Sequence, residues 1–204
     1  MLMNNFEFML MNNPVRGLVQ EYIEAQQLRK LSTLPNGKVV LEIGCGNGHG
    51  TRLIKKYFHP KRIYAIDLDK KMIQIAKQKN TDTNITFEVG DAAKLKYKNN
   101  TFDAVFDFAI IHHIPNWKDC LVELKRVLKP NGQLIIEDLS VETFTTPFGT
   151  IMKRLLDHPY KKMYQRSEFI SYLKQIGFKV IKKETHYPLG TIQYFHIIAV
   201  KTGL

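Results

Sequence analysis

The chain has 204 residues, of which 44% are hydrophobic and 24% are charged, and its formal net charge is +11. This length fits one domain, 1–204, with a full core, and the composition is that of a globular rather than a disordered protein. No run of 18 apolar residues occurs, which argues against a membrane-spanning helix. The N-terminal segment lacks the basic region and cleavage site of a signal peptide, and the two cysteines make no disulfide framework. We therefore expect a cytoplasmic protein.

The basic excess is concentrated in the last quarter of the chain. Residues 151–204 contain ten Lys/Arg and three Asp/Glu, a net of +7, whereas residues 1–150 have a net of +4. A solvated basic surface is the simplest interpretation. The alternative is attraction to an anionic partner such as nucleic acid, anionic lipid or an acidic small molecule, and composition does not separate the two.

Short apolar runs alternate with amphipathic patterns along most of the chain. A helix is expected at residues 17–31, within an N-terminal helical cap that covers 1–35. Five strands are then predicted, in chain order, at residues 38–43, 62–67, 85–91, 101–111 and 132–139. Helices are expected between them, at residues 50–58, 70–79 and 117–128. This alternation is typical of a parallel, doubly wound α/β sheet.

The end of the chain departs from this alternation. Residues 167–177 have a helical pattern, with Ser167 as the expected N-cap and Gly177 as the residue that follows the helix. Two more strands are expected at 178–187 and 191–201. The three residues between them are too few for a parallel crossover, so these strands are predicted to form an antiparallel hairpin.

The first predicted strand runs into a glycine-rich loop, in the sequence VVLEIGCGNGHG at residues 39–50. Glycine permits positive φ angles and close approach of a ligand to the backbone. The free N–H groups at the start of the following helix attract anionic groups. A P-loop is not favoured, because no Lys-Ser/Thr pair follows the glycines, and the dinucleotide pattern counted from Gly44 has His49 in place of its last glycine.

Two aspartates follow the next two predicted strands, at the same edge of the sheet. Asp67 ends the second strand, 23 residues after Gly44, where a carboxylate can accept hydrogen bonds from ribose hydroxyls. Asp91 follows the third strand, where it can accept from an adenine amine while the Ala92 N–H donates to a ring nitrogen. Each aspartate alone could be a turn residue, but together they predict a ligand that contains adenosine.

Five segments in order resemble the class I S-adenosylmethionine-dependent methyltransferases, in particular the broad type (methyltransferase type 11) that is similar to the quinone-biosynthesis methyltransferases. They are VVLEIGCGNG, YAIDLD, VGDAAKL, FDAVFDFAIIHHI and ELKRVLKPNGQLII. The resemblance covers about residues 15–200 and implies a Rossmann-like, seven-stranded sheet that ends in an antiparallel hairpin. It also implies S-adenosylmethionine as cofactor, with S-adenosylhomocysteine as product, and no obligate partner is evident.

The resemblance assigns cofactor contacts to ten residues. The methionine part is expected to lie against Glu42, Gly44, Cys45 and Gly46, the ribose against Asp67 and Leu68, the adenine against Asp91 and Ala92, and the methionine side of the cleft against Asp107 and Phe108. S-adenosylmethionine has no pyrophosphate, so the incomplete dinucleotide pattern is sufficient for it.

Two histidines, His112 and His113, follow the fourth predicted strand at the expected edge of the cofactor site. Adjacent side chains point in different directions, so at most one is expected to face the substrate, as a general base or an orienting group. The alternative is a structural histidine that bonds a backbone carbonyl. Asp107 and Asp138 suggest the metal site of the catechol methyltransferases, but the rest of that pattern is not visible, so no metal is expected.

The acceptor is expected to bind between the N-terminal segment, the end of the fourth strand and residues 140–166. That last segment is rich in aromatic, Met and basic residues, with a helix expected near 150–156, and is a candidate lid. A lid packed only against itself is the alternative. The alternatives for the Met-rich N-terminal segment are closure over the site, peripheral contact with a membrane surface, and disorder.

The leading interpretation is methyl transfer to a small-molecule acceptor that is lipid-like, quinone-like or another metabolite. The basic charge suggests an RNA methyltransferase as the alternative, although no separate nucleic-acid-binding domain is visible. An NAD-dependent oxidoreductase and a non-catalytic cofactor-binding subunit are remoter alternatives.

Overall fold

A computed structural model describes residues 17, 20–156, 158–187 and 193–203. The Met-rich N-terminal segment and the three residues expected to link the last two strands lie outside these ranges. No helix among the described residues has the length and apolar character that crossing a membrane requires.

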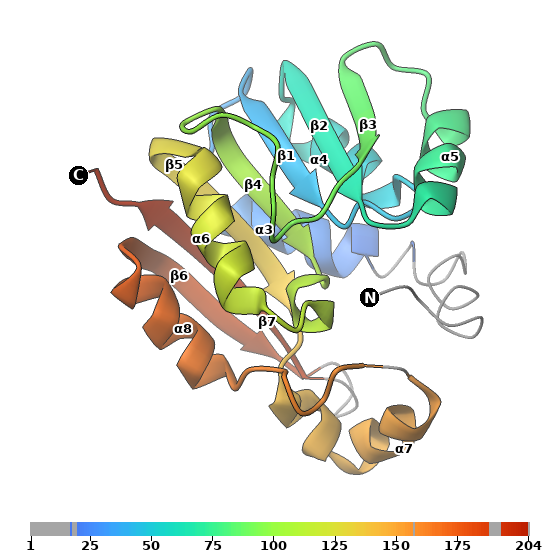
Figure 1. The fold of residues 1–204 in the computed structure, drawn as a ribbon, viewed down its shortest axis with the longest axis vertical. Helices are drawn as coiled ribbons and strands as arrows, with labels where there is room; N and C mark the ends of the chain where they lie inside the picture. The colour runs from blue at the N-terminus through green and yellow to red at the C-terminus, as the bar shows by residue number, and fades with distance from the viewer. Residues whose placement is uncertain (1–16, 18–19, 157, 188–192, 204) are drawn as a thin grey trace.

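The core of the molecule is one seven-stranded sheet (Figure 1). Its strands are β1 (Val39–Ile43), β2 (Arg62–Asp67), β3 (Ile85–Val89), β4 (Phe102–Phe108), β5 (Leu128–Asp138), β6 (Phe178–His186) and β7 (Tyr194–Lys201). Their order is β3-β2-β1-β4-β5-β7-β6, in which the first five strands are parallel and β7 is antiparallel to both of its neighbours. The predicted fold class, including the terminal antiparallel pair, is confirmed.

Helices cover both faces of the sheet, as its nearly continuous apolar strands require. One face packs against α6 (Trp117–Val127) and α8 (Arg166–Gln175), which lie in front of the sheet in Figure 1. The other face packs against α3 (Gln26–Leu31), α4 (His49–Phe58) and α5 (Lys70–Lys79). Because these layers bury both faces, binding groups are left to the loops at the strand ends.

The N-terminal helical region is less regular than the sequence predicts. A π-helical stretch, Gln20–Ala25, precedes α3, so the expected single helix over 17–31 is divided. Leu28 is buried against the sheet face that α4 also covers, and the Ser32 hydroxyl donates a hydrogen bond of 2.9 Å to Gln133 on β5. The region therefore covers the sheet as well as preceding it.

The predicted candidate lid has its own short helices. A 3₁₀-helix, η3 (Val141–Thr145), follows β5 and leads to α7 (Pro147–Leu155), and both lie beyond the carboxyl end of β5 (Figure 1). Tyr164, at the end of this segment, is buried between Trp117 of α6 and Phe169 of α8. The segment is thus attached to the core at its C-terminal end.

Two local predictions at the chain's end have different outcomes. Helix α8 begins at Arg166 after Gln165, which makes no side-chain cap, so Ser167 is inside the first turn and the expected N-cap was wrong. Gly177 does follow the helix, with a φ of +90° that a residue with a Cβ rarely adopts.

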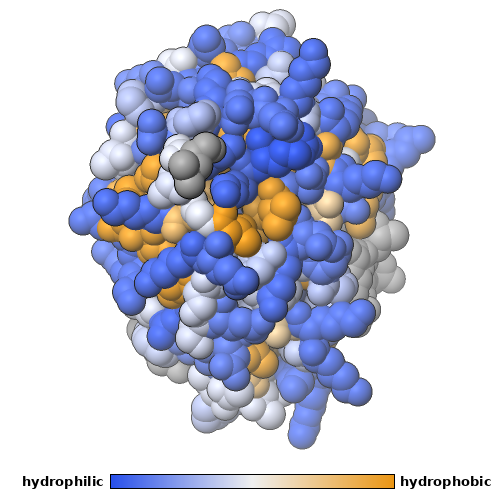
Figure 2. All heavy atoms as spheres, turned by 60° about the vertical axis from the view of Figure 1, so that its left-hand side comes forward, coloured by the Kyte–Doolittle hydropathy of each residue, from blue (hydrophilic) through white to orange (hydrophobic). Residues whose placement is uncertain are grey.

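The basic last quarter of the chain contributes the edge strand of the sheet. Lys179, Lys182 and Lys183 of β6 are exposed, and hydrophilic residues dominate this side of the molecule (Figure 2). Charged side chains on an edge strand disfavour pairing with another sheet. The position of these lysines on an edge strand therefore explains part of the basic excess in residues 151–204.

Candidate active site

The glycine loop turns sharply where β1 ends. Gly44, Gly46 and Gly48 have φ angles of +63°, +52° and +79°, in the left-handed region that only glycine adopts without strain. A Cβ on Gly44 would also overlap the side chain of Ile110, which crosses the loop from the end of β4. The backbone conformation of the loop thus explains why glycine occurs at alternate positions. The turn directs the N–H groups at the start of α4 toward the carboxyl end of the sheet.

The Asp67 carboxylate holds this loop in place. It lies at the end of β2 and accepts hydrogen bonds of 2.8 Å from the Gly46 N–H and from the Asp69 N–H. Burial raises the pKa of Asp67 above its usual value, and these two backbone donors oppose the shift. A residue predicted only as a ligand contact therefore also connects β2 with the glycine loop.

Two neighbouring cavities open at the carboxyl ends of the parallel strands, and they share four lining residues: Gly44, Asp67, Ile110 and His113. Of the residues predicted from the sequence, one or both cavities are lined by Gly44, Cys45, Gly46, Asp67, Leu68, Asp91, Ala92, Phe108 and His113. The structure thus brings together residues from the ends of β1, β2, β3 and β4, as the position of ligand sites in open α/β sheets requires.

Three predicted residues do not line either cavity within the described part of the chain. Glu42 is 1% exposed and lies beneath the first turn of α4, where the Thr51 hydroxyl donates to its carboxyl group and its oxygen lies against the Gly50 backbone. Burial raises its pKa to about 8. Asp107 and His112 are the other two.

Asp107 lies below the turn that follows β4, and so does not share the position of Phe108 beside the cavity. One of its oxygens accepts a 3.0 Å hydrogen bond from the Ile110 N–H, while the other is buried without a hydrogen-bond partner. Burial raises the Asp107 pKa well above its usual range, with Asp138 nearby acting in the same direction. Its visible role is to hold the turn that positions Ile110.

The two adjacent histidines differ in exposure, but their ring centroids lie only 4.1 Å apart, so the side chains do not diverge in the way that the sequence predicts. They lie on the 3₁₀-helix η2 (Ile111–His113), where His113 lines both cavities and His112 is 2% exposed. The Nδ1 atom of His112 contacts the Asp138 carboxylate at the end of β5, to which the Tyr164 hydroxyl also donates. His112 is therefore bonded to a carboxylate rather than to the expected backbone carbonyl.

A third histidine, His158, was missed by the sequence reasoning. It follows α7, and its ring centroid lies 5.0 Å from that of His112 and 4.3 Å from that of His113. Burial, followed by the neighbouring histidines, lowers the pKa of His113 well below its usual value, and burial and His112 lower that of His158 to about 3. Nothing in the local sequence around His158 indicates this position, which depends on how the candidate lid folds back.

A separate cavity lies between α8 and strands β6 and β7. Its lining includes Arg166, Lys183, Glu184 and His196. None of the predicted site residues lines this cavity. It lies at the β7–β6 end of the sheet, whereas the glycine loop follows β1. We therefore assign the candidate active site to the two cavities at the strand ends.

Comparisons with known proteins agree with this position. Residues 41–136, which run from within β1 to within β5, match the methyltransferase domain family. The phthiotriol/phenolphthiotriol dimycocerosates methyltransferase 1 of Mycobacterium ulcerans is 33% identical over 104 residues, and the fatty-acid O-methyltransferase of Mycolicibacterium smegmatis is 33% identical over 102 residues.

These matches are partial in length. They cover 51% and 50% of this chain but 38% and 37% of the two relatives, so the chain matches less than two-fifths of each. The fold match is more extensive: an S-adenosylmethionine-dependent methyltransferase of Aquifex aeolicus superposes with a TM-score of 0.76 at 22% identity, over 98% of this chain and 99% of that one. Residues 41–136 therefore match a methyltransferase domain, and the chain as a whole has the fold of the Aquifex aeolicus methyltransferase.

Proposed function

We propose that this protein transfers the methyl group of S-adenosylmethionine to a small, lipid-like acceptor. The observation that carries the proposal is the meeting of Asp67, Asp91 and the glycine loop around two connected cavities. Such an arrangement offers acceptors for ribose hydroxyls and for an adenine amine, with backbone N–H groups for a carboxylate.

In this proposal the cofactor supplies the activated methyl group and the protein aligns the acceptor with it. The adenosine would lie in the cavity lined by Asp67, Leu68, Asp91 and Ala92, and the methionine part in that lined by Cys45 and Gly46. His113 borders both cavities, so a methyl group at their junction would face it. We assign His113 to positioning the acceptor, and its role as a base stays a prediction.

The surface of α7 supports an apolar acceptor. Phe148, Ile151 and Leu155 follow the spacing of one helix face and are 40%, 59% and 49% exposed. Lys153 and Arg154 lie in the last turn of the same helix. An apolar surface next to basic groups suits a lipid with an anionic or polar head, which is also the acceptor class named for the two mycobacterial relatives.

The RNA alternative has weaker support. The exposed lysines of β6 lie along the sheet edge, whereas the candidate site is at the carboxyl ends of β1, β2 and β4. A nucleic-acid surface would have to bring basic groups to the reacting methyl. The exposed apolar surface of α7 favours a lipid-like acceptor instead.

The ribose assignment predicts a loss of cofactor affinity in Asp67→Ala. We expect S-adenosylhomocysteine to bind at least about tenfold more weakly by calorimetry, equivalent to about 1.4 kcal/mol, because the variant lacks both carboxylate oxygens. Asp82→Ala, which removes a surface aspartate paired with Lys55, serves as the matched control and should bind normally. Asp67→Asn keeps one oxygen for the Gly46 N–H. Circular dichroism checks that each of the three variants is folded. A folded Asp67→Ala variant with wild-type affinity would refute the ribose role.

A second prediction concerns the buried carboxyl group of Glu42. With its pKa near 8, Glu42 is mostly protonated at pH 7, and the cofactor's ammonium group near the α4 start would favour the ionised form. Binding of S-adenosylhomocysteine at pH 7 should then release close to one proton, seen as a binding enthalpy that differs between phosphate and Tris buffers. Glu42→Gln should remove most of this difference, and Glu88→Gln, on the edge strand β3, should not. A buffer-independent enthalpy for the wild type would contradict the linkage.

The acceptor class is tested with methyl-labelled S-adenosylmethionine. Long-chain fatty acid, long-chain alcohol and transfer RNA are offered separately, and label is expected in a lipid product only. Ile151→Ser should raise KM for the long-chain acceptor several-fold, with little change for a short-chain analogue, because it removes apolar surface from α7. Label found only in RNA, or an equal effect of the variant on both chain lengths, would oppose a lipid-like acceptor.

A further inference from the structure

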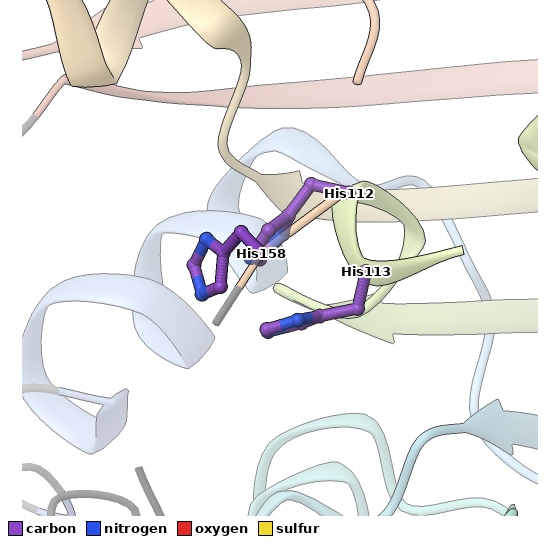
Figure 3. A group of neighbouring side chains, drawn as sticks. All are labelled: His112, His113 and His158. Atoms are coloured by element: carbon purple, nitrogen blue, oxygen red, sulfur yellow. The ribbon is translucent and has the colours of Figure 1, made fainter. Parts of the chain in front are cut away.

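Three imidazole rings gather at the acceptor side of the cleft (Figure 3). His112 and His113 project from η2, and His158 comes from the segment after α7. One ring nitrogen of each lies within 4.8 Å of one ring nitrogen of the others. Three nitrogen ligands from two chain segments are therefore close enough for one ion to contact all three after small side-chain rotations.

His112 has the hydrogen bonding of a metal ligand. Its Nδ1 contacts the Asp138 carboxylate, and its backbone N–H donates to the same group at 3.1 Å. A carboxylate at Nδ1 fixes the tautomer with the proton on that atom and leaves a lone pair on Nε2. Tyr164, which donates to the other oxygen of Asp138, fixes the carboxylate in turn.

The Nε2 atom of His112 is buried and has no hydrogen-bond partner. Buried polar atoms in native proteins nearly always have a partner, so an orphan next to two further imidazoles requires an explanation. Packing of the three rings with Phe144 and Tyr160, which contact His158, accounts for the apolar ring faces. It does not account for a ring nitrogen that points at no donor.

We propose that His112, His113 and His158 bind a divalent transition-metal ion of the zinc type. Neutral imidazole is a preferred ligand of Zn²⁺ and Co²⁺, and three histidines leave the fourth tetrahedral position for water or an acceptor oxygen. This departs from the expectation of no metal, which considered only the carboxylates and could not include His158. The metal site does not depend on the proposed methyl transfer.

A second cluster in the described chain must be distinguished from this one. Glu184, His186 and His196, on β6 and β7, also bring one ligand atom each within 4.8 Å of one another. Here His186 Nε2 already lies 3.4 Å from the Glu184 carboxylate, and Glu184 is exposed. Exposed groups of this kind are common without a metal, so we favour the η2 cluster.

The test is a Co²⁺ titration of the full chain after removal of metals with EDTA. Tetrahedral Co²⁺ absorbs strongly in the visible range, so binding is read without any activity assay. We expect one equivalent to bind with such a spectrum, and both His158→Asn and His113→Asn to weaken binding at least about tenfold. His186→Asn, in the second cluster, and His59→Asn, at the exposed end of α4, are matched controls that should retain the spectrum.

Three results would overturn the proposal. They are the absence of the tetrahedral spectrum in the wild type, unchanged affinity in folded His158→Asn and His113→Asn, and loss of binding in His186→Asn alone. Circular dichroism establishes that each variant is folded, and if His158→Asn unfolds, His113→Asn decides. Wild-type binding of S-adenosylhomocysteine in a chain that does not bind Co²⁺ would refute the metal site alone, and Co²⁺ binding without S-adenosylhomocysteine binding would refute the proposed function alone.

Discussion

The Asp67 carboxylate accepts hydrogen bonds from the N–H groups of Gly46 and Asp69, and the geometry of the candidate site depends on these contacts. It joins the end of β2 to the glycine loop that follows β1. The positive φ angles of Gly44, Gly46 and Gly48 let the loop reach that carboxylate. Beyond it, Ile110 crosses over Gly44, so the ends of three strands define one wall.

Buried carboxyl groups surround this wall from below. Glu42 lies under α4 and Asp107 lies under the turn after β4, and burial raises the pKa of both. Each one is held by a neighbouring donor, the Thr51 hydroxyl or the Ile110 N–H. The cost of burying such groups is consistent with a functional site, where strained or perturbed groups concentrate.

Most of the fold was predictable because it depends on local patterns. The bounds of strand β2 and helix α5 were predicted to the residue, because turn residues flank their apolar patterns on both sides. The division of the first helix by a π-helical stretch and the start of β5 at Leu128, before Pro130, were not, because they depend on packing between distant segments. The cap at Ser167 failed for a similar reason: the Arg166 N–H donates to Glu142, and the N-cap is Gln165, two residues before the expected one.

The convergence of the residues predicted to hold the cofactor could be predicted from the sequence, whereas the position of His158 could not. Gly44, Asp67 and Asp91 follow strands in a regular order, so their convergence follows from the parallel sheet. His158 contacts His112 and His113 only because the residues after α7 return to the end of β4, and no periodic pattern in the sequence predicts that return.

We infer that the two strand-end cavities bind the adenosine and methionine parts of one ligand, and that this ligand has no pyrophosphate. Calorimetric titration of the same protein sample with S-adenosylhomocysteine and with NAD tests it most directly. We expect micromolar, one-to-one binding of S-adenosylhomocysteine and no measurable binding of NAD. Micromolar binding of NAD with none of S-adenosylhomocysteine would contradict it.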